Sequence, residues 1–502
     1  MNDDIVNQIQ TARKDAGLVG AEASKAFNTG TGVVNYDLRP ALVQTYPFTA
    51  EMTMLGSELP RVGANGDTAT RWKALTGINT GNTHMGVSEG NRGGSVTSSV
   101  ANLTAAYSKL GLEDSVTFEA DYASEGLDDL KARATSNLLR AALIGQEKQL
   151  LLGNANNALG TTPTPTVANA GIGGSIAAAT YNVAVVALSP DGLDRAGGFV
   201  AVSATGAALT QTVPQQITKT NVDGTTDTIN AGAAQKSATA GTTTSGSTSV
   251  ITASVAVVDG AAGYAWFVGT AGNEKLVAIT SINSVSITIL PNSGNQALSA
   301  LAAADYSADA TYNMDGIWTY ARASLNATVV ALPTGTAGVG TTLTASGRGT
   351  ITQIDNALVT FYKSWRFNPD QMILSMDDYN NIATKIINNG GAPLARIVQE
   401  ASGGKPVDAG ILTFTYVSPN GQRIRMRVHP FMPQGTILLF STLLPYAGAG
   451  IGSVMQVKCR RDWYATEWPL RTRKWEYGVY ADQVLQHFAP FSMAKITNIA
   501  LG

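Results

Sequence analysis

Sulfur and imidazole ligands are scarce in this 502-residue chain, which contains one cysteine, Cys459, and three histidines, His84, His429 and His487. A single cysteine excludes an intramolecular disulfide framework and a cysteine-based zinc site. The three histidines lie far apart in the sequence, so only chance convergence would bring them to one metal. We therefore disfavour metalloenzyme and thiol-redox functions and expect no metal or cofactor.

Charged side chains are also few. Asp, Glu, Lys and Arg make up 14% of the residues, whereas a typical soluble domain contains about 25%. The net charge of −2 argues against a dedicated nucleic-acid-binding protein, because such proteins usually carry a clear basic excess. Hydrophobic residues make up 44% of the chain, which suffices for more than one core and excludes global disorder. The length predicts about three domains.

A secretory leader and long apolar runs are missing as well. The start of the chain, Met1-Asn2-Asp3-Asp4, has neither a basic region nor an apolar core, so we expect no signal peptide. The uncharged stretches 149–190, 276–304 and 431–457 are interrupted by polar residues, proline or glycine. None offers the roughly 20 consecutive apolar residues of a membrane span. We expect a protein that works without a membrane.

Catalytic motifs are weak throughout the chain. Residues 86–90 match the G-x-S-x-G pattern, but a nucleophile elbow needs a buried strand before it and a helix after it. Here the motif lies in a loop rich in glycine and asparagine. The glycine-rich runs at 338–349 and 448–452 fit neither a phosphate-binding loop nor a dinucleotide fingerprint. We therefore predict no catalytic residues and no enzyme activity.

The middle of the chain, residues 154–310, differs in composition from both flanks. It is rich in Thr, Ser, Ala, Val and Gly, and its short β-favouring runs are separated by turn residues. The run 264–268 is apolar at every position, which is typical of a strand paired on both sides. Such spacing predicts an all-β sandwich of the Ig or fibronectin type, inserted into another domain. A carbohydrate-binding module is the alternative.

The segment before this block predicts extended elements and a long helix. Residues 4–27 have the pattern of an amphipathic helix or arm. Residues 67–75 and 95–100 predict a hairpin whose hydrophobic face is too small for independent stability. Apolar residues three and four positions apart predict a helix over 122–152. Together with the later segments, they indicate the α+β class.

The segment after the block alternates helices and strands. Apolar spacing predicts a helix over 351–365, followed by a short buried strand at 372–374. The sequence 375–378 resembles a capping box that opens another helix. An Asn-Gly turn between 411–418 and 422–429 predicts a β-hairpin.

Basic clusters near the C-terminus are the strongest remaining signal, and the last of them adjoins several tryptophans and tyrosines. Arg, Trp and Tyr are enriched in protein interfaces, although aromatic and basic residues also form surfaces for nucleic acid. Because the net charge is near zero, we favour subunit contact over weak DNA contact. The candidate interface residues are Arg71, Trp72 and Lys73 in the first hairpin, Arg423, Arg425 and Arg427 on one face of a later strand, and Arg471, Arg473, Lys474 and Trp475.

The order of these parts resembles the major capsid proteins of tailed bacteriophages, which have the Hong Kong 97-type capsid fold. The end of the long helix, GQEKQLLLGN at 145–154, is similar to the E…LL-G ending in that family. MDGI at 314–317 looks like the family's entry into its axial domain, and NPDQMILS at 368–375 resembles its central strand. RTRKWEYGVY at 471–480 resembles its last peripheral-domain strands.

The resemblance implies a phage capsid fold of the α+β class with an inserted all-β Ig-like sandwich. Its implied parts are an N-terminal arm (1–65), an E-loop hairpin (66–100), a peripheral domain with a spine helix (101–153), the Ig-like insert (154–310), an axial domain (311–410) and returning axial and peripheral strands (411–502). The implied function is self-assembly into pentamers and hexamers of an icosahedral shell that encloses double-stranded DNA. The implied location is the virion, after assembly in the host cytoplasm.

The resemblance also implies partners. These are other copies of the chain, a portal protein, decoration proteins and, by weak non-specific contact, the packaged double-stranded DNA. We expect a separate scaffolding protein, because no long charged segment precedes the arm. No residue matches the Lys–Asn crosslink of some relatives, so none is predicted. The alternative is a phage tail or fibre/adhesin protein whose Ig-like domain binds glycans; a secreted hydrolase is more distant.

Overall fold

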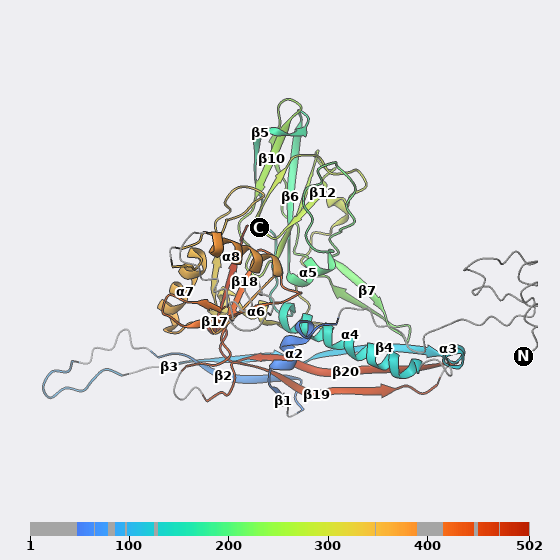
Figure 1. Ribbon diagram of the computed structural model, residues 1–502, viewed down its shortest axis with the longest axis vertical. Helices are drawn as coiled ribbons and strands as arrows, with labels where there is room; N and C mark the ends of the chain where they lie inside the picture. Colours follow the sequence, from blue (N-terminus) through green and yellow to red (C-terminus); the bar gives the residue numbers. More distant parts are fainter. Residues whose placement is uncertain are drawn as a thin grey trace, which may run out of the picture.

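The computed structural model describes residues 48–64, 66–78, 86–95, 98–124, 129–346, 348–388, 415–445, 450–470 and 472–500. A long flat sheet carries a helix along one face, and a two-stranded hairpin extends from its end (Figure 1). A second part contains a six-stranded sheet with helices, and an all-β part projects above both. The α+β class expected from the sequence is confirmed. Among the described helices, none is long and apolar enough to span a membrane.

The flat sheet has the strand order β1-β19-β20-β4. Its strands are β1 (Arg61–Gly63), β19 (Met455–Glu467), β20 (Lys474–His487) and β4 (Ser108–Thr117). Only the β1–β19 pair is parallel. Residues from the two ends of the chain therefore build one sheet. The short helices η1 (Ala50–Thr53) and α2 (Met54–Glu58) precede β1.

The long helix α4 (Leu130–Leu152) lies along the flat sheet (Figure 1). The expectation of one helix over 122–152 is wrong at its start. A separate helix, α3 (Phe118–Ala123), precedes it and has its C-cap at Ser124. Asp129 then begins α4, because its carboxylate accepts the backbone N–H of Ala132 at 3.0 Å and so satisfies a donor of the first turn.

The six-stranded sheet has the order β14-β21-β18-β15-β17-β16. Its strands are β14 (Thr328–Ala331), β21 (Met493–Thr497), β18 (Ile437–Phe440), β15 (Gln371–Leu374), β17 (Arg423–Val428) and β16 (Thr415–Val417). Helices α7 (Thr352–Trp365) and α8 (Met376–Asn388) accompany it. The predicted helix 351–365, strand 372–374 and Asn-Gly hairpin are confirmed in the described residues.

The all-β part contains two sheets that share a core. One sheet has the order β13-β10-β5 and the other β12-β11-β6-β9. The strands are β5 (Thr166–Ile176), β6 (Thr180–Leu188), β9 (Ala240–Thr243), β10 (Ser249–Ser254), β11 (Gly263–Gly269), β12 (Lys275–Thr280) and β13 (Ser284–Ile287). Ile251 of one sheet and Val185 and Trp266 of the other belong to a single buried cluster. The run 264–268 is paired on both sides, by β6 and β12, as predicted.

The remaining elements connect these parts. A small hairpin of β7 (Gln216–Thr220) and β8 (Thr226–Asn230) leaves the all-β part and runs down toward the end of the flat sheet near α3 (Figure 1). Short helices lie between the strands and near the C-terminus: α5 (Pro190–Arg195), η2 (Leu298–Ala300), α6 (Ile317–Tyr320), η3 (Ala323–Leu325) and η4 (Pro490–Ser492). The two ends of the all-β part meet, since the N–H of Asp309 donates to the carbonyl of Asn154 at 3.0 Å.

Candidate functional site

The first hairpin consists of β2 (Ala69–Ile78) and β3 (Ser98–Ala106), so it reaches beyond the predicted end at residue 100. Arg71 and Lys73 are exposed, and the Arg71 guanidinium lies 3.8 Å from Asp67. Trp72 points to the other face, as alternation along a strand requires. Its ring packs edge-on against the ring of Phe488, the residue that follows strand β20 of the flat sheet. The two ring centroids are 6.1 Å apart. In this group, Arg71 and Lys73 are therefore exposed cations, whereas Trp72 packs against another part of the subunit.

The arginine stripe lies on the exposed face of β17, and the intervening Ile424 and Met426 are buried. Arg427 binds both carboxylate oxygens of Glu58 in α2, with Nη2 at 2.7 Å from Oε1. This guanidinium holds the pKa of Glu58 below its ordinary value. Arg427 therefore connects α2 to the six-stranded sheet, whereas Arg423 and Arg425 face outward on the same strand.

The third candidate group stands at the start of β20. Arg471 lies outside the described residues. Arg473 pairs with Glu119 at 3.0 Å, and Lys474 pairs with Glu476 at 2.9 Å. The ring of Trp475 packs against Phe118, and the Lys131 ammonium lies 4.0 Å from its centroid. The contacts of Arg473 and Trp475 therefore connect the end of the flat sheet to α3 and α4.

The three candidate groups do not converge on one site. The hairpin, β17 and the α3 end of the flat sheet occupy separate places in the subunit (Figure 1). Their arrangement suits several contact surfaces better than a single binding pocket. A chain that contacts several neighbours needs surfaces of this kind.

A buried junction around Glu147 was not found from the sequence. Glu147 of α4 is fully buried and accepts the backbone N–H groups of Leu55 at 2.7 Å and Gly56 at 2.8 Å. The Nε2 atom of His429 lies 3.0 Å from the same carboxylate. The Nδ1 atom of His429 accepts the N–H of Phe431 at 3.2 Å, so its proton resides on Nε2 and is donated to Glu147.

This junction joins three segments that are distant in sequence: α2, α4 and the residue after β17. A carboxylate that receives three donors is well compensated although it has no contact with solvent. The sequence held one signal for it, since Glu147 lies beside the buried Leu150 and Leu151 on the apolar stripe of the helix. A charge on an apolar stripe needs partners inside the protein.

The other reactive side chains have structural environments. Burial lowers the pKa of His487 to about 3, and its Nδ1 accepts the N–H of Ala489. Burial also raises the pKa of the Cys459 thiol, which makes it a poor nucleophile. His84 lies outside the described residues. Within the part of the chain that the structure describes, no group of three or more His, Cys, Asp or Glu side chains could hold a metal ion.

No protein-family model matches the sequence, and no curated protein matches it. Solved structures do match. The capsid of Myoviridae phage XM1 aligns at 10% identity and a TM-score of 0.41, covering 93% of this chain and 99% of that one. The capsid of the empty GTA particle aligns at 7% identity and a TM-score of 0.43, covering 96% of this chain and 100% of that one. The capsid structure of cyanophage P-SCSP1u aligns at 7% identity and a TM-score of 0.39, covering 96% of this chain and 99% of that one.

The likeness is to capsids. It extends over nearly the whole length of each of these chains. The identities are 10% or lower and the TM-scores lie below 0.5. A functional proposal for this chain therefore rests on its own residues and contacts.

Proposed function

We propose that this chain is a major capsid protein, a non-enzymatic subunit that assembles with copies of itself into pentamers and hexamers of an icosahedral shell. The β2–β3 hairpin is the observation that carries the proposal. Among the described strands, β2 and β3 pair only with each other. Ala105 is the one buried residue in β3. Trp72 and Ala105 pack on the subunit's own core, but most side chains of β3 are exposed. Because a two-stranded hairpin alone is marginally stable in water, we expect a neighbouring copy to cover this exposed part.

The low charge of the chain supports the same proposal. Surfaces that are covered by neighbours do not need the charged residues that keep a monomer soluble. Several charges outside the all-β part are already neutralised within the subunit, as in the pairs Arg427–Glu58 and Arg473–Glu119. Arg71, Lys73, Arg423 and Arg425 are exposed and are the cations we assign to contacts between subunits.

We infer an Ig-like sandwich for the insert, residues 154–310, from its strand order. In an Ig-type sandwich, strands C, F and G are neighbours in one sheet, and B and E are neighbours in the other. Here β6, β11 and β12 are neighbours in one sheet, and β5 and β10 in the other. Their order along the chain is that of B, C, E, F and G. Its projection above the flat sheet fits a position on the outer surface of a shell (Figure 1).

The proposed organisation assigns the other parts by their place in the subunit. We assign α4 as the spine helix, the flat sheet as the peripheral domain, the six-stranded sheet as the axial domain and residues 66–106 as the E-loop hairpin. The proposed partners beyond other copies are scaffolding, portal and decoration proteins, with weak non-specific contact to packaged double-stranded DNA. The proposed location is the virion.

Particle stoichiometry tests this proposal. The purified chain, imaged by negative-stain electron microscopy and weighed by native mass spectrometry, should form species of five or six copies of the 52.1 kDa chain, or closed shells. Stable trimers would point instead to a tail or fibre protein. A monomer that forms no larger species when it is concentrated or mixed with a crowding agent would contradict self-assembly.

A further inference from the structure

One strand of the insert and one strand of the six-stranded sheet contribute to the same apolar core. In β11, Trp266 belongs to the core of the sandwich, whereas the next residue, Phe267, belongs to a second core. In β18, Leu439 belongs to a core with residues of α7 and α8, whereas the preceding Leu438 belongs to the same second core as Phe267. Successive side chains of a strand point to opposite faces of its sheet. The insert and the six-stranded sheet therefore each turn one face toward a shared core.

The shared core includes further fully buried residues from the segments that follow the insert. Ile317 of α6, Ile373 of β15 and Met493 of β21 belong to it and have no exposed surface. Separating the insert from these segments would expose apolar surface on both sides, and exposed apolar surface costs roughly 25 cal/mol per Å². The two parts thus stabilise each other by burial.

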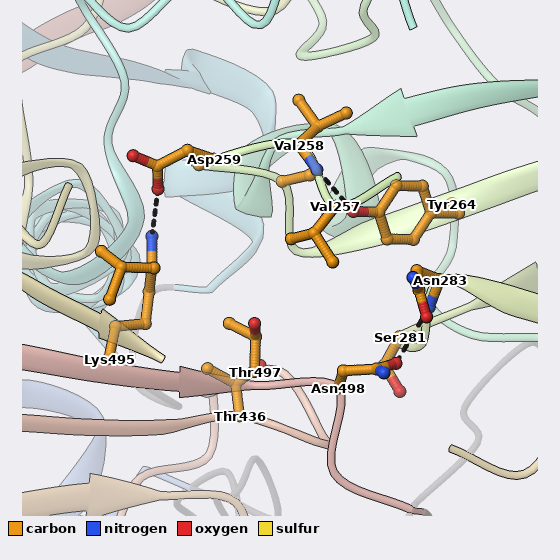
Figure 2. A pocket seen from close by; sticks show the side chains of 13 residues that line it. Val257, Val258, Asp259, Tyr264, Ser281, Asn283, Thr436, Lys495, Thr497 and Asn498 are labelled. Carbon is orange, nitrogen blue, oxygen red and sulfur yellow. Dashed lines mark hydrogen bonds and ion pairs between the residues drawn. The ribbon is translucent and has the colours of Figure 1, made fainter. Parts of the chain in front are cut away.

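Polar contacts cross the same boundary in the region that Figure 2 shows. The Lys495 ammonium of β21 lies 3.4 Å from the carboxylate of Asp259, in the loop before β11. The backbone N–H of Asn283, between β12 and β13, donates to Asn498 Oδ1 at 3.1 Å. Lys495 is only 1% exposed. A buried ammonium is costly without a partner, and the insert supplies this partner.

Two more segments that follow the insert in the chain also bind it. Trp318 of α6 is 1% exposed, and its Nε1 donates to the carbonyl of Gly260 at 3.0 Å. The N–H of Gly338 donates to Ser284 Oγ at 3.1 Å. Gly338 has a φ of +78°, and a Cβ there would lie 2.8 Å from the backbone nitrogen of Ser286. The close approach of this loop to the insert therefore requires glycine.

We infer that the insert and the six-stranded sheet form one cooperative unit, in which the insert is a rigid extension of the subunit and does not move on its linkers. A domain that moves freely is joined to the rest of its chain by exposed linkers, with few contacts across the boundary. Here a shared apolar core and contacts from α6, Gly338 and β21 cross it. The inference concerns the single subunit and does not depend on the capsid proposal.

Hydrogen exchange in two conservative variants of the full chain tests the inference. Ile251 is fully buried in the sandwich core and Ile437 in the core beside α7 and α8, and these two cores share no member among the described residues. Ile251→Val and Ile437→Val should each speed the slowest amides of their own part by about two- to tenfold. In one cooperative unit these amides exchange through the same opening. Each variant should therefore speed the slowest amides of both β11 and β18 by the same factor.

Ile172→Val is the matched control, because Ile172 of the insert is 89% exposed and its truncation should leave exchange in both strands unchanged. Mass spectrometry of the unassembled chain measures exchange strand by strand. If the shifts are too small to compare, Ile251→Ala has a larger effect and gives the same comparison. Faster exchange of β11 alone in the Ile251 variants, or of β18 alone in Ile437→Val, would overturn the inference, because the two parts would then open separately.

Discussion

Strand β11 of the insert and strand β3 of the hairpin both lack charged residues, but their surroundings are opposite. Six of the seven residues of β11 are buried, whereas one of the nine residues of β3 is buried. The insert completes its core within the chain. The hairpin does not, and we propose that a neighbouring copy supplies the missing surface. In our proposal, low charge therefore has two origins in this molecule, a finished core in one region and a contact surface in the other.

The central sheet of the insert shows how complete that core is. Val185 and Trp266 face the second sheet of the sandwich. Val186 and Phe267, on the opposite face, pack in a second cluster with Leu193 of α5. Apolar residues at consecutive positions are expected for a sheet covered on both sides. The hairpin has no comparable cover among the described residues.

The largest expected effect tests the finished core. Trp266→Ala should lower the free energy of unfolding by about 3–5 kcal/mol, because it removes a fully buried ring and leaves a cavity. Chemical denaturation of the full chain measures this. Trp468→Ala is the control, since Trp468 is 40% exposed and should cost less than 1 kcal/mol. Equal losses in the two variants would show that the insert core is not packed as described.

The next largest effect tests the junction that holds α2, just before the hairpin, to α4. Glu147→Gln should cost about 3 kcal/mol, because one amide oxygen cannot accept all three donors and its NH₂ group faces N–H groups. The matched control is Glu119→Gln, which removes an exposed ion pair with Arg473 and should cost less than about 1 kcal/mol. Denaturation curves that shift equally for the two variants would contradict the role of the junction.

Acid should lower the stability of the flat sheet, which contains His487, more than that of the insert. The insert contains none of the three histidines. The folded pKa of His487 is about 3, and an unfolded histidine titrates near 6.5. Below about pH 6.5 the unfolded chain therefore binds a proton that the folded chain does not, so stability falls as the pH falls toward 3. At pH 4.5 the loss from this residue is about 2–3 kcal/mol.

His487→Gln tests this contribution, because glutamine does not titrate. The measurement is the free energy of unfolding at pH 7 and pH 4.5 in both proteins. The variant should lose less stability between the two pH values than the parent. An identical loss in both proteins would show that His487 does not carry the acid sensitivity.

The smallest effect on folding is expected in the hairpin. Arg71→Glu combined with Lys73→Glu should change the free energy of unfolding by less than about 0.5 kcal/mol, since both side chains are exposed. Assembly, measured by analytical ultracentrifugation, should be strongly weakened. Lys219→Glu in the exposed strand β7 of the insert is the control and should assemble normally. Normal assembly of the hairpin variant would contradict a contact role for these two cations.

Local patterns in the sequence predicted the elements that depend on local chemistry. The buried run 264–268, the Asn-Gly hairpin and the Ser375 cap, whose hydroxyl accepts the N–H of Asp378 at 3.1 Å, all follow from neighbouring residues. The start of α4 was misplaced because apolar spacing continues across the end of α3 at Ala123 and the cap of α4 at Asp129.

Contacts between distant segments could not be predicted in the same way. Glu147 meets His429 across 282 positions, and Arg427 meets Glu58 across 369. The arginine pattern on β17 correctly indicated that the three arginines share one face of the strand, but it could not show that Arg427 is already paired within the subunit. Nothing local distinguishes it from Arg423 and Arg425, since all three alternate with apolar residues.

Hydrogen–deuterium exchange of the free subunit and of the assembled particle tests the central claim most directly, that the hairpin is completed by a neighbouring copy. The backbone amides of β2 and β3 should exchange at least about tenfold more slowly in the particle, because a covered hairpin opens less often. The amides of β6 and β11 should exchange equally slowly in both states. Equal exchange of the hairpin amides in the free and assembled forms would contradict the account.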